Sequence, residues 1–286
     1  MPKPHPQAVQ GAASIAPADL IAGMAKGMAV LESFDTERQR LNATLAAQRA
    51  GLTRAAARRH LLTLAHLGYL ETDGSYFWLS AKVLRFAGSY LASSRLPRTV
   101  QPTLNRLAAL TRESFSVTVL EGDAVVVVAR SVPLVSVTVG NSAAAGLEAG
   151  AEVPPVRLLA QGLHLGARLP AHATSTGRVL LAALPRTALA DWLRGRQLHR
   201  LTAYTVTDAK AFRALLVEAR QQDYALASEE HELGVHAVAV PLRNAEGATV
   251  AALNVVVPES RVRSGAVQRE LLPLLQGAAL ELRALL

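Results

Sequence analysis

The first third of the chain repeats apolar residues at the spacing of short amphipathic helices. From about Gly23 onward, Met28, Leu31 and Phe34 recur about once per helical turn, which predicts a first helix. The preceding residues 1–20 contain several prolines and scattered alanines without an apolar period. We therefore expect residues 1–20 to form a disordered tail.

Capping residues predict two further helices in this region. Asn42 is a favoured N-cap for a short second helix, and Gly51 is placed to end it. Thr53 is placed to cap a third helix that runs to Leu67 and is closed by Gly68. Two short helices joined by a tight glycine turn have the spacing of a helix-turn-helix.

A hairpin signal follows the third helix. Asp73-Gly74 lies between two short runs of residues that favour strands. Three helices followed by a hairpin indicate a winged helix-turn-helix domain, which we assign to residues 21–81. The next helical pattern predicts a linker helix over residues 82–96, and Pro97 marks a domain boundary.

The remaining residues, 97–286, mix both periods and predict a second domain of α+β or α/β class. Helices are predicted at 98–111, 176–184, 187–194 and 208–222, and from about 260 to the C-terminus. Strands are predicted at 115–120, 124–130, 135–139, 224–228, 235–242 and 249–257. Residues 141–160, rich in Ala, Gly and Pro, are interpreted as an insertion.

Composition limits the class of protein. The chain has 286 residues, 50% of them hydrophobic, which suits about two domains of roughly 150 residues. The absence of cysteine excludes disulfides, thiolate nucleophiles and cysteine-ligated zinc. Its longest aliphatic runs are about a third of a membrane span, and its N-terminus lacks the apolar core of a signal peptide. We expect a cytoplasmic protein without a membrane partner.

The placement of charge favours nucleic acid as a partner. The formal net charge is +8, with 26 arginines and 4 lysines. Residues 1–96 carry eleven basic and six acidic side chains, whereas residues 97–286 are nearly balanced, with 19 and 16. From Arg38 to Leu70 there are six arginines and no acidic residue. Such a local basic field attracts polyanions.

The third predicted helix carries the densest part of this charge. Arg54, Arg58 and Arg59 cluster on its N-terminal half, and the alanines at 55–57 leave that surface uncrowded. Leucines at 61, 64 and 67 form another stripe, which we expect to anchor the helix. The arginines can read guanine edges or hold phosphates, and the sequence leaves this choice open. A merely solvated arginine face is the alternative interpretation.

Two motifs in the second domain resemble catalytic signatures without completing them. Residues 173–177 (ATSTG) approach the Gly-x-Ser-x-Gly nucleophile elbow, but alanine replaces its first glycine. A hydrolase with Ser175 as nucleophile is therefore the alternative function. His231 and His236 are five residues apart, whereas two zinc ligands on one helix must be four apart. We predict no catalytic residue, metal or cofactor.

Several segments together resemble the IclR family of bacterial transcription regulators, in particular its PcaR/PobR branch, which is associated with aromatic-acid catabolism. The resemblance covers the chain from about residue 24 onward, except for the insertion. The segments that carry it are GMAVLESFD at 27–35, GLTRAAARR at 51–59, LLTLAHLGY at 61–69, LPAHATSTGRVLLAALP at 169–185 and EEHELGVHAVAVP at 229–241.

The resemblance implies a winged helix-turn-helix domain, a linker helix and a GAF-like effector-binding domain. It also implies a homodimer or homotetramer that binds palindromic or repeated half-sites of promoter DNA in the nucleoid, under control of a small aromatic acid such as protocatechuate or 4-hydroxybenzoate. The implied DNA-binding residues are Asn42, Thr44, Thr53, Arg54, Arg58, Arg59, Ser75 and Tyr76. The implied effector-binding residues are Ser175, Thr176, Gly177, His236, Ala237, Asn254 and Val256.

Four of the implied pocket residues also have a purely structural interpretation. Ser175 and Thr176 are equally suited to capping a helix, His236 to an exposed strand position, and Asn254 to a satisfied core position. Against the family pattern, His236 occupies a place often held by arginine, and His60 a place usually held by a large apolar residue. The small and apolar residues at 227, 237 and 256 favour an aromatic ring over a small keto acid.

Overall fold

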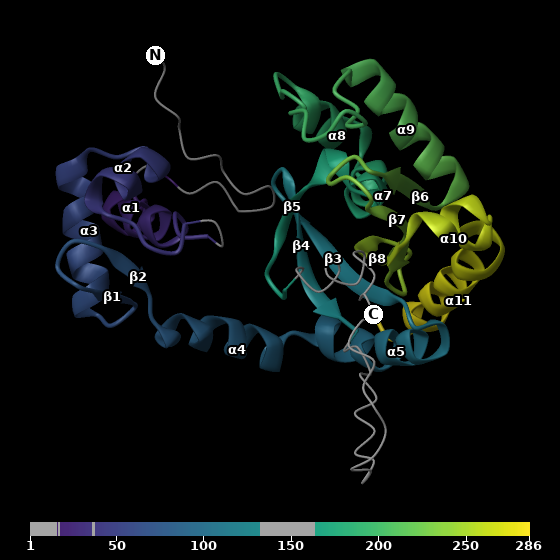
Figure 1. Cartoon of the computed structure of the whole chain (residues 1–286), viewed down its shortest axis with the longest axis horizontal. Helices are drawn as coiled ribbons and strands as arrows, with labels where there is room; N and C mark the ends of the chain where they lie inside the picture. The colour runs from purple at the N-terminus through teal and green to yellow at the C-terminus, as the bar shows by residue number, and fades with distance from the viewer. Residues whose placement is uncertain (1–15, 17, 36–37, 132–163) are drawn as a thin grey trace, which may run out of the picture. The chain divides into compact units, whose positions relative to one another are not determined.

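The computed structural model describes residues 16, 18–35, 38–131 and 164–286. The chain forms two compact units, residues 1–93 and 94–286, and each is described by itself (Figure 1). The predicted strand at 135–139 and the predicted insertion at 141–160 lie outside the described residues, as does most of the predicted tail.

The N-terminal unit has the predicted order of three helices and a hairpin. Its elements are α1 (Ala22–Leu31), α2 (Ala43–Ala50), α3 (Arg54–His66), β1 (Leu70–Thr72), β2 (Phe77–Leu79), a 3₁₀ turn (Ala81–Val83) and α4 (Leu84–Ser93). Strands β1 and β2 pair antiparallel across the predicted Asp73-Gly74 turn. Leu41 extends this sheet by exchanging two backbone hydrogen bonds with Phe77, of 2.9 and 2.8 Å.

The predicted caps set the ends of the two central helices. The side-chain oxygen of Asn42 accepts hydrogen bonds of 3.0 Å from the N–H groups of Thr44 and Leu45 at the start of α2. Gly51 ends α2 in the left-handed conformation at φ 65°, which costs glycine little. The Thr53 hydroxyl accepts from the Ala56 N–H at 3.2 Å and starts α3.

The buried stripe of this unit differs in part from the predicted one. Val30 and Leu61 are fully buried, whereas Met28, part of the predicted apolar period, and Leu67, which we expected to anchor α3, are 48% and 49% exposed. Met28 lies roughly 200° around the helix from Val30, and Leu67 lies beyond the last residue of α3. His60 packs beside Gly27 of α1, with its ring nitrogen Nδ1 3.6 Å from the place that a Cβ would occupy, and α3 runs unbroken past it.

The C-terminal unit contains a six-stranded antiparallel sheet in the order β5-β4-β3-β8-β7-β6. Its strands are β3 (Ser114–Glu121), β4 (Ala124–Arg130), β5 (Arg168–Pro170), β6 (Ala225–Ser228), β7 (His236–Arg243) and β8 (Thr249–Val257). Its helices are α5 (Arg95–Thr111), α7 (Ser175–Ala183), α8 (Arg186–Leu193), α9 (Ala209–Gln222), α10 (Glu259–Arg263) and α11 (Leu272–Arg283).

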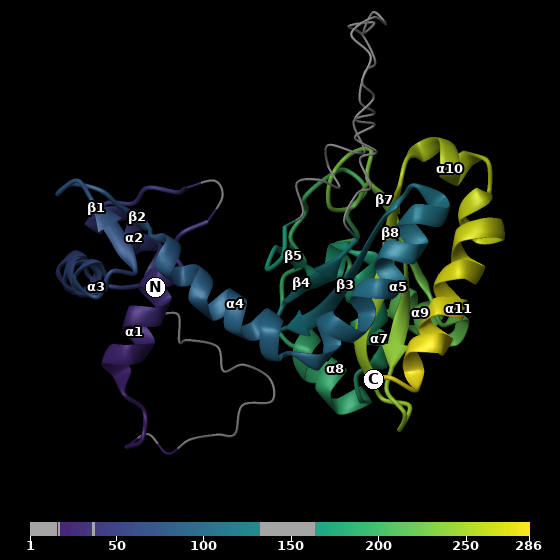
Figure 2. The same cartoon turned by 90° about the horizontal axis from the view of Figure 1, so that it is seen from below.

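Helices cover both faces of this sheet (Figures 1 and 2). One core joins α5 and α11 to the sheet face that carries Leu253 and Val255. The other joins α7, α8 and α9 to the opposite face, through residues such as Ala239 and Ala252. Because strand side chains alternate between faces, one strand serves both cores. The predicted α+β class is thereby confirmed.

The predicted C-terminal helix is interrupted. Instead of one helix from about residue 260, the chain forms α10, a π-helical turn (Val267–Leu271) and α11. Gly265 follows α10 at φ 70°, a left-handed conformation that ends a right-handed helix. In the described ranges, no helix is both long and apolar enough to cross a membrane.

We predict that Asn42→Ala destabilises the N-terminal unit by about 1 kcal/mol, because two N–H groups at the start of α2 lose their acceptor. Urea unfolding of the full chain, followed by far-UV circular dichroism, measures this change. Asn42→Asp keeps the acceptor and is the matched control, expected to stay within a few tenths of a kcal/mol. Equal stability of the alanine variant and the parent would contradict the capping role.

Candidate functional site

Helix α3 presents an exposed arginine surface. Arg54, Arg58 and Arg59 are all exposed on it. Within the described residues, none of the three forms an ion pair. Their positive charge is therefore available to an external anion such as phosphate.

Other arginines of the acid-free stretch do have acidic partners. Arg40 binds Asp73 at 2.6 Å, and Arg49 binds Asp35. Both carboxylates come from outside the stretch, so the absence of acids in the sequence overstates the free charge. Among the described residues, Arg38 and the three arginines of α3 form no ion pair, so the surface of α3 keeps its positive charge.

The β1–β2 turn carries the two predicted wing residues. The Asp73 carboxylate accepts hydrogen bonds from the N–H groups of Tyr76, at 2.8 Å, and Ser75, at 3.0 Å. These backbone bonds, with the Arg40 charge, hold the pKa of Asp73 below its usual range. Ser75 and Tyr76 are exposed at the tip. Gly74 allows this sharp turn, at φ 95°.

The remaining predicted DNA-binding residues lie at the two helix starts. Asn42 and Thr53 use their side-chain oxygens as caps, which leaves the Asn42 amide N–H groups for an outside partner. Thr44 is exposed in the first turn of α2.

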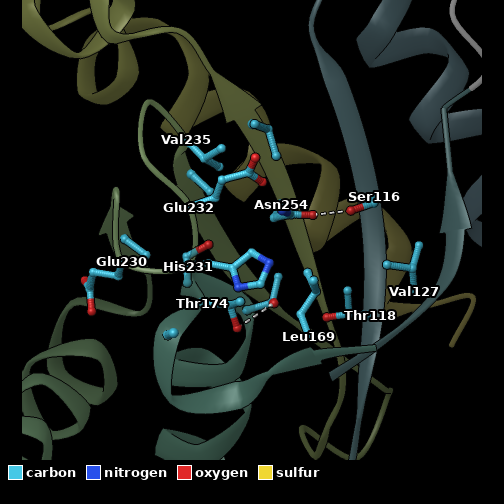
Figure 3. A pocket seen from close by; sticks show the side chains of 16 residues that line it. Ser116, Thr118, Val127, Leu169, Thr174, Glu230, His231, Glu232, Val235 and Asn254 are labelled. Carbon is cyan, nitrogen blue, oxygen red and sulfur yellow. Dashed lines mark hydrogen bonds between the residues drawn. The ribbon is translucent and has the colours of Figure 1, made fainter. Parts of the chain in front are cut away.

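The C-terminal unit has a cavity between its sheet and the start of α7. The cavity is open to solvent, and its empty space together with the solvent at its mouth is about 720 Å³. It is lined by Ser116, Thr118, Val127, Leu169, Ala173, Thr174, Ser175, Thr176, Ala227, Glu230, His231, Glu232, Val235, Ala237, Asn254 and Val256. Figure 3 shows His231 from one wall and the Asn254–Ser116 pair from another converging on the same space.

The structure brings together five of the seven predicted effector residues: Ser175, Thr176, Ala237, Asn254 and Val256 all line this cavity. Asn254 and Val256 lie on one face of β8, as the two-residue period predicts. On the neighbouring strand Ala237 is the register partner of Val256. The cavity wall is thus a contiguous piece of the sheet.

Gly177 does not line the cavity, and its role is steric. A Cβ built at this position would overlap the backbone of Ala171, including its carbonyl oxygen. The Gly177 N–H donates to the Thr174 hydroxyl at 3.1 Å. Glycine therefore lets the first turn of α7 pack against the preceding 3₁₀ turn (Ala171–Ala173), which holds Ser175 and Thr176 at the wall.

His236 also does not line this cavity. It shares the parity of Val238 and Val240, whose side chains belong to the core beneath α11, on the opposite face from Ala237. Its ring is 6% exposed and lines a separate smaller space with residues that include Ser228. The sequence pattern predicted this strand, and the resemblance implied an effector-binding role for His236, but strand alternation places its ring on the other face.

Polar atoms without a protein partner face the cavity. Ser175 Oγ, Thr118 Oγ1 and His231 Nδ1 are buried and make no hydrogen bond to any described residue. Ser116 donates a 2.5 Å hydrogen bond to the Asn254 side-chain oxygen. This bond leaves the Asn254 amide N–H groups to bind a ligand.

A buried ion pair connects two walls of the cavity. Arg178 of α7 binds both carboxylate oxygens of Glu230, one at 2.6 Å, and the two side chains are 5% and 8% exposed. Arg178 also donates to the Leu226 carbonyl at 2.6 Å. The guanidinium thus joins α7 to β6 and to the loop that follows β6.

The sequence analysis missed the polar residues on β3 and the loop before β7. Ser116 and Thr118 alternate with the apolar residues at 115, 117 and 119 along β3, and this pattern was a usable signal for a ligand-facing wall. These residues lie beside Asn254 because β3 pairs with β8, and the two strands are far apart in the sequence. His231 was considered only as a metal ligand. Within the described residues no cluster of three metal-binding side chains occurs.

Comparisons with known proteins match both units. Residues 23–74 match the IclR helix-turn-helix domain, and residues 151–284 match the family described as bacterial transcriptional regulator IclR C-terminal. The Pca operon regulatory protein of Acinetobacter baylyi is 48% identical over 94% of this chain and 90% of its own length.

Two further similarities concern aromatic acids. The p-hydroxybenzoate hydroxylase transcriptional activator of Acinetobacter baylyi is 48% identical over 93% of this chain and 92% of its own. A solved double mutant of the PobR inducer-binding domain from Acinetobacter, in complex with 3-hydroxybenzoic acid, is 43% identical. It covers 66% of this chain and 98% of its own, with a TM-score of 0.55.

We predict that Glu230→Gln destabilises the C-terminal unit by about 3 kcal/mol or more, because it leaves the buried Arg178 charge without its counter-ion. Thermal unfolding of the full chain measures the loss. Asp191→Asn, which removes the carboxylate of an exposed pair with Arg194, is the matched control and should change stability by less than about 1 kcal/mol. Similar effects of the two variants would refute a special role for the buried pair.

Proposed function

Because this chain belongs to the IclR family of bacterial transcription regulators, we propose that a small aromatic acid bound in the cavity controls its binding to promoter DNA. The observation that carries the proposal is the composition of the cavity, which combines apolar walls with separate polar groups near the start of α7 and on the sheet. A hydroxylated benzoate has the same arrangement of an apolar ring between two polar ends.

The start of α7 is suited to the carboxylate of such a ligand. The first N–H groups of a helix have no partner within it and favour negative charge. Ser175 adds a hydroxyl that is 1% exposed, faces the cavity and has no partner among the described residues. The carboxylate would therefore meet several donors within one turn.

The sheet is suited to the ring and its hydroxyl groups. Ala227, Ala237 and Val256 are small or apolar and leave a flat surface against which a ring can pack. Asn254 and Thr118 provide an amide and a hydroxyl on the same face. Protocatechuate and 4-hydroxybenzoate are the ligands we favour, and the similarity to regulators named for these pathways supports them.

Promoter DNA would bind the surface of α3. Arg54, Arg58 and Arg59 supply unneutralised charge at the start of the second helix of a helix-turn-helix, the helix that enters the major groove in such motifs. Ser75 and Tyr76 of the wing, with Asn42, Thr44 and Thr53 at the helix starts, would contact the backbone. The regulator would act in the cytoplasm, on nucleoid DNA.

A homodimer or homotetramer would give this module its specificity. One recognition helix reads few base pairs, whereas two related by symmetry read half-sites about one helical turn apart. The target would then be palindromic or contain repeated half-sites. The acid would regulate by binding one arrangement of the assembly more tightly than another, since a ligand shifts an equilibrium only through its differential affinity.

The alternative of a hydrolase lacks support. The relatives named above are transcription regulators, not enzymes. A serine nucleophile requires a base within hydrogen-bond reach. Ser175 Oγ forms no hydrogen bond to any residue in the described part of the chain.

We predict that Arg54→Ala, Arg58→Ala and Arg59→Ala each weaken binding to the chain's own upstream intergenic DNA by about tenfold to a hundredfold, because each removes a charge or a base contact. Gel retardation at moderate salt measures this loss. Arg213→Ala, on the exposed side of α9, is the matched control and should bind like the parent. No retardation by the parent, or equal losses for Arg58→Ala and Arg213→Ala, would overturn the proposed DNA surface.

We predict that Ser175→Ala and Asn254→Ala each weaken binding of protocatechuate and 4-hydroxybenzoate about tenfold, because each removes one hydrogen bond to the ligand. Titration calorimetry on the full chain measures the affinity. Ser228→Ala, in the separate space beside His236, should bind as the parent does. Unchanged affinity in both cavity variants would remove our assignment of the site.

A further inference from the structure

His231 is held inside the cavity by a loop that closes on itself. The Glu229 N–H donates to the Val235 carbonyl at 2.7 Å, and the Gly234 N–H donates to the Glu229 carboxylate at 2.8 Å. From outside the loop, the Thr205 hydroxyl donates to the Glu230 carbonyl at 2.7 Å. Figure 3 shows the His231 ring projecting from this loop into the cavity, next to Thr174 at the start of α7.

The ring is a polar group without a protein partner. Its Nδ1 atom is buried and has no hydrogen bond to any described residue. Among the described lining residues, His231 is the only side chain that can become positively charged, since none of them is lysine or arginine. The other ionisable lining residues are Glu230 and Glu232.

The groups around the ring leave it neutral in the empty cavity. Burial lowers the pKa of His231, His172 lowers it further, and Glu232 acts in the opposite direction. The Glu230 carboxylate is taken up by Arg178 and points away from the ring in Figure 3. The Nε2 atom of His172 donates a hydrogen bond of 2.9 Å to the His199 carbonyl oxygen.

We propose that His231 determines the preference of the site for carboxylates by taking up one proton when the acid binds, so that an imidazolium faces the bound carboxylate. The proposal rests on the proposed function and adds the chemical basis of its specificity. One proton moves from solvent to the imidazole, and no covalent bond of the ligand changes. The ring's place beside the start of α7 puts the new charge next to the helix end that already attracts the anion.

Proton uptake gives the site a pH dependence of defined sign. Desolvation disfavours the imidazolium in the empty cavity, and an adjacent carboxylate favours it. Affinity should therefore rise as pH falls from about 8 towards 6, by up to about tenfold per pH unit, and level off below the pKa of the free protein's ring. The ligand's carboxyl group, which titrates near pH 4, stays ionised throughout this range.

Calorimetric titration of the full chain with 4-hydroxybenzoate, from about pH 6 to pH 8 in buffers of different ionisation enthalpy, tests the proposal. For the parent we expect an uptake of up to one proton per ligand, greatest between the pKa of the free ring and that of the ligand-bound ring. For His231→Gln, with folding checked by thermal melting, we expect a loss of proton uptake and a nearly flat affinity. His199→Gln, at an exposed histidine outside the cavity, is the matched control and should behave as the parent.

The neutral analogue 4-hydroxybenzamide keeps the aromatic ring of the ligand and lacks the carboxylate charge. We expect it to bind more weakly than 4-hydroxybenzoate, with an affinity that is independent of pH. Binding of 4-hydroxybenzoate without proton uptake, or with uptake that persists in His231→Gln, would overturn this inference and leave the proposed function standing. Absence of binding by 4-hydroxybenzoate and protocatechuate at every pH would overturn both.

Discussion

The ion pair between Arg178 and Glu230 is the interaction on which the ligand cavity depends. It joins α7 to the loop after β6, two elements that approach only in the folded chain, and both partners are almost completely buried. Because removing one partner leaves an uncompensated buried charge, the two elements are held together more strictly than apolar packing alone requires. Arg178 lies in the first turn of α7, and Glu230 directly precedes His231. The ion pair therefore holds the start of α7 and His231 at a constant spacing across the cavity.

Because side chains alternate between the two faces of the sheet, one face packs against supporting helices and the other lines the cavity. On β8, Leu253 and Val255 pack beneath α5 and α11, whereas Asn254 and Val256 face the cavity. On β7, the same rule turns Ala237 towards the cavity and His236 away from it. A one-residue shift in register would exchange these roles throughout a strand. Packing by the two helical layers fixes the register of the central strands, and the cavity lining depends on that register.

The sequence was sufficient wherever local chemistry decides the outcome. Asn42 and Thr53 are caps, Gly51 ends a helix and Asp73-Gly74 makes a turn, because each depends on residues within a few positions. It was insufficient where distant segments decide. The exposure of Met28, the face taken by His236 and the pairing of Ser116 with Asn254 depend on which elements pack together, and no local period contains that information. The break at Gly265 is an intermediate case. The glycine is a local signal for a helix end, but the leucine period of the last helix favoured one continuous helix.

The proposed ligand would act on the rest of the unit through the unpaired polar atoms of the cavity. Ser175, Thr118 and His231 each present a buried atom for which the described residues supply no partner. A buried polar group that lacks a hydrogen bond is destabilising by about 1–3 kcal/mol, so such groups favour any arrangement that satisfies them. They come from α7, from β3 and from the loop before β7, and a single acid that bonds to all three draws these elements towards one arrangement. A ligand that bonds to only one of them would have less of that differential affinity, so we expect hydrogen bonds to all three groups, more than the shape of the cavity, to distinguish an effector from other compounds that fit.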